Sequence, residues 1–392
     1  MIATELSTAQ PVALATDDAL WSRALDRTHE VLSLAAKGMV EPGSAAFTVA
    51  ACAARADDQR GPELVSLMRR ALVRGSWSSD TLLRCLRSLA RAGGPVDIPR
   101  LVQFTRAAGR APRIAAAALG EAAARGEQSA TGALIDALET PVRADAALFL
   151  SYLCTQESLN ALARRLRTPG PAGVTAAGAL VAAEDDPFAF EVLCERLCEP
   201  SVAVLAAQAL WGAAPDGKRL LEAESALSRW SRRGIALAEH GRLVAGAMLT
   251  AGGITQDVTA TYRAAASDEE ELALVGARAA FALGDAERAR TTAMDLLRRG
   301  PTYASRSFQL LVSWAELGDD RSLALVRSTL ERRPVDLARS SVFEALAGTT
   351  RRGLCGVVAR AVGATDRLTA LEGARALARL REPPSIVPGL WM

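Results

Sequence analysis

Histidine and lysine are almost missing from this sequence. Its 392 residues contain only the histidines His29 and His240 and the lysines Lys37 and Lys218. Histidines so far apart leave no Ser-His-Asp arrangement and no metalloprotease signature, and we recognise no strand followed by a glycine-rich loop. We therefore expect no catalytic residue, no metal and no cofactor, and we favour a binding protein over an enzyme.

A surplus of positive charge is also missing. Lysine and arginine total 46 against 44 acidic residues, which gives a net charge of +2. A protein that depends on phosphate contacts normally has a clear basic excess, so nucleic acid is a disfavoured partner. Because arginine replaces lysine almost everywhere, we interpret the composition as that of a GC-rich, bacterial genome.

Long apolar runs and aromatic residues are scarce as well. The longest gently apolar stretch, 171–183, is too short to span a bilayer, and the first fifteen residues do not resemble a secretion signal. We expect no membrane insertion and a cytoplasmic location. Six irregularly spaced cysteines suit free, buried thiols in a reducing compartment; the pair Cys194 and Cys198 leaves metal binding as a minor alternative. The six are Cys52, Cys85, Cys154, Cys194, Cys198 and Cys355.

What the sequence does contain is an internal repeat. Similar phrases begin at Pro141, Pro171 and Pro200, and each places a pair of alanines three residues before a leucine. These leucines, Leu150, Leu180 and Leu210, are thirty residues apart. A fixed period of this length predicts stacked helical hairpins.

The same register extends over most of the chain. The residue four positions before each leucine is usually small and shares one helical face with it, as close helix packing requires. The predicted anchor leucines are Leu89, Leu119, Leu150, Leu180, Leu210, Leu249, Leu283, Leu317, Leu346 and Leu377. The small residues before them include Cys85, Ala115, Ala146, Ala176, Ala206, Ala245, Ala279 and Ser313.

These patterns predict an all-α fold, an α-solenoid of about ten to eleven helical hairpins. We expect a disordered segment at 1–17, an array at 18–214, a second array at 215–381 and a proline-rich tail at 382–392. An apolar stripe, Trp21, Leu25, Leu32 and Leu34, is expected to cap the first repeat. The tail is expected to cover the open face of the last repeat around Leu371 and Leu377, with docking into a partner as the alternative.

Two phrases resemble a known repeat family. Val142-Arg143-x-x-Ala146-Ala147 and Val275-x-x-x-Ala279-Ala280-x-Ala282-Leu283-Gly284 are similar to the short HEAT repeats first described in phycobilisome lyases. The resemblance covers most of 40–380. It implies an armadillo-like scaffold that binds partners, although a minority of such proteins are lyases or DNA glycosylases. No catalytic residue of the family can be placed on this sequence.

A second resemblance lies within 272–334. Ala282-Leu283-Gly284-Asp285 aligns with Glu316-Leu317-Gly318-Asp319 at a spacing of 34 residues, which resembles tetratricopeptide repeats. Both families have the same α-hairpin architecture. The tetratricopeptide resemblance would strengthen the case for peptide binding.

Candidate binding residues follow from the helical face opposite the anchors. Positions five before, two before and two after an anchor place Arg84, Arg87 and Arg91 on one outward face, while Tyr152 and Trp211 lie near the anchors of later repeats. Such a surface would hold an acidic peptide through arginine pairing and aromatic anchoring. The plainer interpretation is a solvated charged face beside ordinary packing aromatics.

We therefore predict a non-enzymatic scaffold or adaptor that binds another protein through a concave surface. One alternative is a nucleic-acid-binding or DNA-repair protein that uses Arg84, Arg87, Arg91 and Arg113. Another is a lyase-like protein or chaperone that acts on a partner, which would need a deep pocket.

Overall fold

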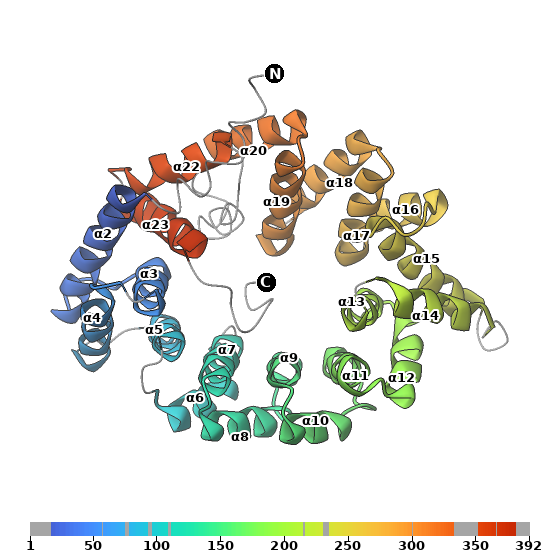
Figure 1. Cartoon of the computed structure of the whole chain (residues 1–392), viewed down its shortest axis with the longest axis horizontal. Helices are drawn as coiled ribbons and strands as arrows, with labels where there is room; N and C mark the ends of the chain where they lie inside the picture. The colour runs from blue at the N-terminus through green and yellow to red at the C-terminus, as the bar shows by residue number, and fades with distance from the viewer. Residues whose placement is uncertain are drawn as a thin grey trace. The chain divides into compact units, whose positions relative to one another are not determined.

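The protein is all α-helical over the residues that its computed structural model describes (Figure 1). Within these ranges there are 21 helices and no strands. The all-α prediction is thereby confirmed for this part of the chain. The described ranges are 17–56, 58–74, 78–92, 96–108, 111–214, 216–229, 235–299, 301–332, 352–365 and 367–381.

The helices form two compact units, and the first of them combines both ends of the chain. Unit 1 comprises residues 1–127 and 304–392, and unit 2 comprises 128–303. These bounds differ from the predicted division into 18–214 and 215–381, because the C-terminal helices pack against the N-terminal ones. The predicted segments 1–17 and 382–392 lie outside the described residues, apart from Asp17.

Unit 1 starts with a capped helix. The side chain of Asp17 accepts a hydrogen bond of 2.9 Å from the backbone N–H of Leu20, as an N-cap does. Its N-terminal helices are α2 (Asp18–Ala36), α3 (Ser44–Arg55), α4 (Gly61–Arg74), α5 (Ser79–Arg91), α6 (Ile98–Thr105) and α7 (Ala111–Ala124). Its C-terminal helices are most of α19 (Pro301–Glu316), α20 (Asp320–Arg332), α22 (Arg352–Val362) and α23 (Arg367–Arg381).

Helix α23 joins the two ends of the chain within unit 1. It packs against α22, which precedes it, and also against α2 and α3 (Figure 1). At this junction the Cys52 thiol donates a hydrogen bond of 2.9 Å to the carbonyl oxygen of Ala378. Leu371 and Leu377 are both buried. Helices α2 and α23 contact each other, so each covers part of the apolar face of the other. The tail that was predicted to cover Leu371 and Leu377 lies outside the described residues.

Unit 2 contains two alternating series of helices. One series is α8 (Gln128–Ala137), α10 (Gln156–Ala163), α12 (Pro187–Leu197), α14 (Lys218–Arg229), α16 (Val258–Ala265) and α18 (Ala286–Arg299). The other is α9 (Arg143–Leu153), α11 (Pro171–Glu184), α13 (Ala203–Ala213), α15 (Ile235–Ala251) and α17 (Glu270–Ala282). Each helix of the second series packs against the next member of that series as well as against its chain neighbours.

Small residues allow this packing. A Cβ atom added to Gly178 of α11 would lie 2.8 Å from the Cβ of Ala209 in α13. Helix α17 approaches α16 even more closely, because a Cβ at Gly276 would lie 2.1 Å from the backbone nitrogen of Ala265. Most predicted anchors and the small residues before them are accordingly buried. The buried anchors are Leu89, Leu119, Leu150, Leu180, Leu210, Leu249 and Leu377.

Two predicted anchors are wrong. Leu317 is 75% exposed, and Leu283 is a half-buried C-cap residue at the end of α17. The glycine after each of these leucines has a positive φ, +86° at Gly284 and +104° at Gly318, and this conformation ends the helix. The positions inside α19 that are buried instead belong to Leu311 and Ala315. Leu346 lies outside the described residues.

The Leu-Gly-Asp motif is therefore a turn between helices. The backbone N–H of Asp285 donates to Ala280 O at 2.9 Å, and that of Asp319 donates to Trp314 O at 3.0 Å, as in a Schellman motif. The side chains of Asp285 and Asp319 then accept from the backbone N–H groups of the next helices. Each Leu-Gly-Asp motif ends one helix and starts the following one.

The cysteine prediction is partly corrected. Cys52, Cys85, Cys194 and Cys355 are buried and Cys198 is half-buried, but Cys154 is exposed. It occupies the left-handed C-cap of α9, with a φ of 47°, beyond the packed part of the helix. In the described part of the chain no helix is long and apolar enough to cross a membrane.

Replacing Leu180 tests the core register. Leu180→Ala should lower the free energy of unfolding by about 2–5 kcal/mol, because the side chain is buried in the core of unit 2. Arg165→Ala should change it by only ~0–1 kcal/mol, since this arginine forms a partly exposed ion pair with Glu139. Urea unfolding of both variants measures the difference. Equal losses would contradict the register.

A pair of glycine substitutions tests the close helix approach. Gly276→Ala should destabilise unit 2 by about 1–3 kcal/mol, because the added methyl group meets the backbone of α16. Gly132→Ala is the matched control: Gly132 lies inside α8 and has nothing within 4 Å of the added methyl group. That change should stabilise the protein by about 0.4–1 kcal/mol. Thermal unfolding of the two variants should show shifts of opposite sign.

Candidate functional site

The three predicted arginines do not form one exposed stripe. Arg84 and Arg87 are half-buried on α5, whereas Arg91 is only 5% exposed. The Nε atom of Arg91 lies 4.0 Å from Oε1 of Glu121, a residue of the adjacent helix α7. The predicted outward orientation of Arg91 is therefore wrong, because α7 packs along the end of α5 and supplies a counter-charge there.

Further arginines gather where α3, α5 and α7 end. Arg55 is the last residue of α3, and Arg125 follows α7 and donates a hydrogen bond from Nη2 to the carbonyl oxygen of Arg91. Burial lowers the pKa of Arg125, and the charge of Arg55 lowers it further, while Glu121 opposes the shift. Positive side chains at the carbonyl ends of helices satisfy those carbonyl groups and their dipoles. Arg55, Arg91 and Arg125 are 36 and 34 residues apart, and this regular spacing is a signal in the sequence that the predicted arginine face did not use.

Trp211 is a packing residue. A Cβ at Gly252 would lie 2.0 Å from its ring, and one at Gly217 would lie 3.1 Å from it. The indole thus fills space that two glycines leave open between α13, the turn after it and the end of α15. Trp211 is half-buried in this position, and its role in binding a partner stays a prediction.

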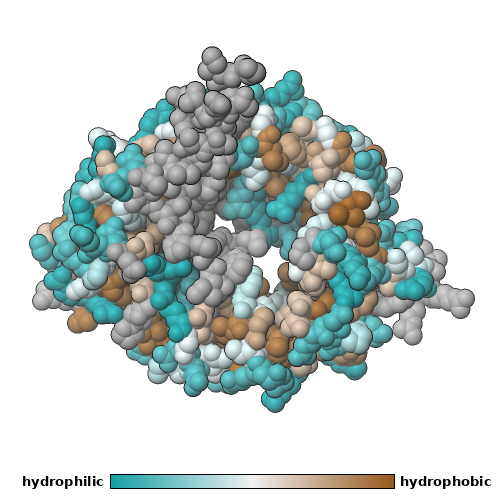
Figure 2. Space-filling view, viewed as in Figure 1, coloured by the Kyte–Doolittle hydropathy of each residue, from teal (hydrophilic) through white to brown (hydrophobic). Residues whose placement is uncertain are grey.

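Tyr152 belongs to a half-exposed face of α9. It is half-buried, and burial raises the pKa of its phenol. Leu148, one turn before it, is also half-buried, as is Leu205 on α13. The space-filling view shows hydrophobic residues among polar ones in this part of the molecule (Figure 2). Leu205 packs partly against the core of unit 2, and α11 lies between α9 and α13. We use the name α9–α13 face for the half-buried positions Leu148, Tyr152 and Leu205 of these two helices.

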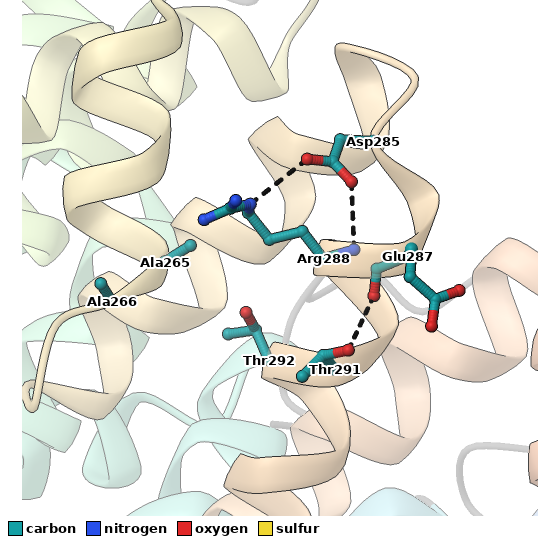
Figure 3. A pocket seen from close by; sticks show the side chains of 7 residues that line it. All are labelled: Ala265, Ala266, Asp285, Glu287, Arg288, Thr291 and Thr292. Carbon is teal, nitrogen blue, oxygen red and sulfur yellow. Dashed lines mark hydrogen bonds and ion pairs between the residues drawn. The ribbon is translucent and has the colours of Figure 1, made fainter.

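A pocket of about 410 Å³ lies between the end of α16 and the first half of α18 (Figure 3). None of its residues was among the predicted site residues. Its chemical groups are one guanidinium, two carboxylates, two threonine hydroxyls and the methyl groups of two alanines and two threonines. The residues that line it are Ala265, Ala266, Asp285, Glu287, Arg288, Thr291 and Thr292.

Three side chains beside the pocket hold one another in place. The guanidinium carbon of Arg288 lies 4.0 Å from the centre of the Tyr262 ring, and its Nε donates to Oδ2 of Asp285 at 3.2 Å. The Tyr262 hydroxyl donates to the same oxygen at 3.0 Å. Oδ1 of Asp285 accepts from the backbone N–H of Arg288 at 3.1 Å. This network connects α16 to α18.

The network changes the acidity of two of its members. The backbone N–H of Arg288 is the main cause that lowers the pKa of Asp285, and the Tyr262 hydroxyl and the Arg288 side chain lower it further. The pKa of Tyr262 is raised, mainly because its hydroxyl donates to Asp285. Near neutral pH Asp285 is therefore a carboxylate and Tyr262 a neutral phenol.

The cysteines of α12 have raised pKa values. Burial raises the pKa of Cys194 to about 12 and also raises that of Cys198, and nearby carboxylates add to both shifts. Both side chains are therefore thiols at neutral pH. In the part of the chain that the structure describes, no three His, Cys, Asp or Glu side chains are grouped as a metal site.

Removing one donor tests the network around Asp285. Its carboxylate contributes stability above the pKa of the unfolded chain, about 3.9, and that contribution is lost as the pH falls through the lower pKa of the folded state. Tyr262→Phe should raise the pKa of Asp285 part of the way to its ordinary value, since the Arg288 N–H remains. Carboxyl ¹³C NMR titration measures the shift, and Tyr152→Phe is the control. An unchanged titration in Tyr262→Phe would contradict the network.

Comparisons with known proteins identify no family. No family model matches the chain, and no curated protein matches it. A solved structure described as the crystal structure of an engineered protein aligns with 96% of this chain and 100% of its own, at 16% sequence identity and a TM-score of 0.26. A TM-score this low carries no argument about fold or function.

Proposed function

We propose that this protein is a non-enzymatic scaffold or adaptor that binds another protein through the concave surface of a HEAT-like α-solenoid. The observation that carries the proposal is the regular packing of α9, α11, α13, α15 and α17, each against the next member of the series. Repeats that contact only their neighbours build extended surfaces, and such surfaces typically bind partners. The similarity of Val142-Arg143-x-x-Ala146-Ala147 to short HEAT repeats agrees with this architecture.

The α9–α13 face is the surface that we assign to the partner. Its side chains Leu148, Tyr152 and Leu205 are half-buried, so part of each one faces solvent. An aromatic and two aliphatic side chains among polar neighbours are typical of the centre of a protein interface. A protein partner in the same compartment, which we infer to be the cytoplasm, is therefore the expected ligand.

The nucleic-acid alternative is weaker. Arg91 is buried beside Glu121, so it is not available for a phosphate group. Of the four arginines in that hypothesis, Arg113 is exposed and Arg84 and Arg87 are half-buried. A continuous basic surface would require more of them to face solvent.

A charge introduced on the α9–α13 face tests the proposal. Leu148→Arg should abolish capture of the partner in affinity purification followed by mass spectrometry, because a guanidinium would be buried in an apolar contact. Leu221→Arg is the matched control, since Leu221 is a 37% exposed leucine on α14 of the same unit. It should leave capture unchanged. If both variants capture the same proteins as the original chain, or if the captured material is nucleic acid, the proposal fails.

A further inference from the structure

One edge of the Arg288 guanidinium makes contacts within the protein, and the other edge is available to a ligand. Its Nε is engaged by Asp285, and Tyr262 lies against its face. In the described part of the chain, its two Nη nitrogens have no hydrogen-bond acceptor, and its side chain is 47% exposed. Figure 3 shows the guanidinium extending across the pocket toward Ala265 and Ala266. The N–H groups of these two nitrogens therefore face the pocket. Because Asp285 and Tyr262 already orient the side chain, Arg288 loses little conformational entropy when a ligand binds.

A hydroxyl lies one helical turn further along α18. Thr292 is four residues after Arg288, so both side chains lie on the same side of the helix. The Thr291 hydroxyl donates to the carbonyl oxygen of Glu287 at 3.0 Å. The Thr292 hydroxyl makes no such bond to any described residue, and it is therefore a second donor for a ligand in the pocket. The methyl groups of Ala265 and Ala266 form the opposite wall.

The charge around the pocket suits a ligand with a single negative charge. Arg288 is the one cation among the lining residues, and Asp285 already offsets part of its charge. The Glu287 carboxylate is engaged by Arg290, whose Nη2 lies 2.8 Å from Oε2, and it points away from the Arg288 guanidinium (Figure 3). A phosphate dianion would lie near two carboxylates with one guanidinium to balance it, whereas a carboxylate matches the two Nη donors and the hydroxyl.

We propose that this pocket binds a carboxylate group of a peptide segment in the partner protein. The carboxylate accepts hydrogen bonds from the Nη nitrogens of Arg288 and from the Thr292 hydroxyl, and the residue that carries it packs against Ala265 and Ala266. The group belongs either to the C-terminus of the peptide or to an Asp or Glu side chain. This inference rests on the proposed function, because it assigns the ligand to a protein partner.

Methyl NMR of the whole protein with ¹³C-labelled alanine provides the test, since Ala265 and Ala266 report directly on the pocket. The probes are N-acetyl-trialanine with a free carboxylate, the same peptide as a C-terminal amide, N-acetyl-Ala-Glu-Ala-amide and inorganic phosphate. We expect saturable shifts of the two methyl signals with a carboxylate peptide, with a dissociation constant on the order of 1 mM. The neutral amide should cause none. Whichever carboxylate peptide binds more tightly identifies the source of the group.

Three substitutions assign the binding to named donors. Arg288→Gln should weaken binding of the carboxylate peptide at least about tenfold, because it removes charge-assisted hydrogen bonds. Thr292→Val should weaken binding less, because it removes a single hydroxyl donor. Arg298→Gln is the matched control: Arg298 is on the same helix and pairs with Asp295 at 2.7 Å, outside the pocket. It should leave binding unchanged. Unaltered methyl signals elsewhere in each variant verify the fold.

The outcomes separate this inference from the proposed function. Equal binding of the neutral amide, unchanged binding in Arg288→Gln, stronger shifts with phosphate, or no shift with any probe would each overturn the carboxylate site. If Arg288→Gln fails to fold, Thr292→Val and the amide peptide still decide the question. If the peptide binds at the pocket but no partner is captured through the α9–α13 face, the proposed function is contradicted and the carboxylate site is still supported.

Discussion

Close approach of helix backbones is the constraint on which the rest of this structure depends. Each helix of the series α9 to α17 packs against the next member of its own series as well as against its chain neighbours, and this is possible only where side chains are very small. Gly178 faces Ala209, and Gly276 lies directly against the backbone of α16. The low aromatic content follows from the same constraint, since a large ring between two such helices would hold them apart. At Trp211, two glycines make room for the large indole ring.

The junction in unit 1 shows the same packing between distant parts of the chain. Helix α23 contacts α3 as α9 contacts α11, although more than three hundred residues separate Cys52 from Ala378. Both helices are rich in alanine, so the junction needs no special sequence. Its consequence is that the first and last described helices stabilise each other.

Arginine over an aromatic ring is a recurrent contact in unit 2. Arg167 lies over Phe188, Arg219 over Phe190 and Arg288 over Tyr262, with distances to the ring centres of 5.2, 5.7 and 4.0 Å. Each connects neighbouring helical hairpins. The Arg288 contact differs because a pocket adjoins it, so the same interaction that joins two hairpins also orients donors toward a ligand. A structural contact and a candidate binding site are thereby combined in one side chain.

The sequence by itself determined the helical class, the period and most of the buried positions. Alanine and leucine four residues apart share one face of any helix, so the burial of Ala146 and Leu150 follows from local geometry. It could not determine the register at Leu283 and Leu317, because a glycine with positive φ ends the helix before the expected anchor is reached. Only the tertiary structure decided that Arg91 is buried, that α23 meets α3, and that Arg288 opens into a pocket. These features depend on which residues of other helices lie opposite, and no spacing along a single helix encodes them.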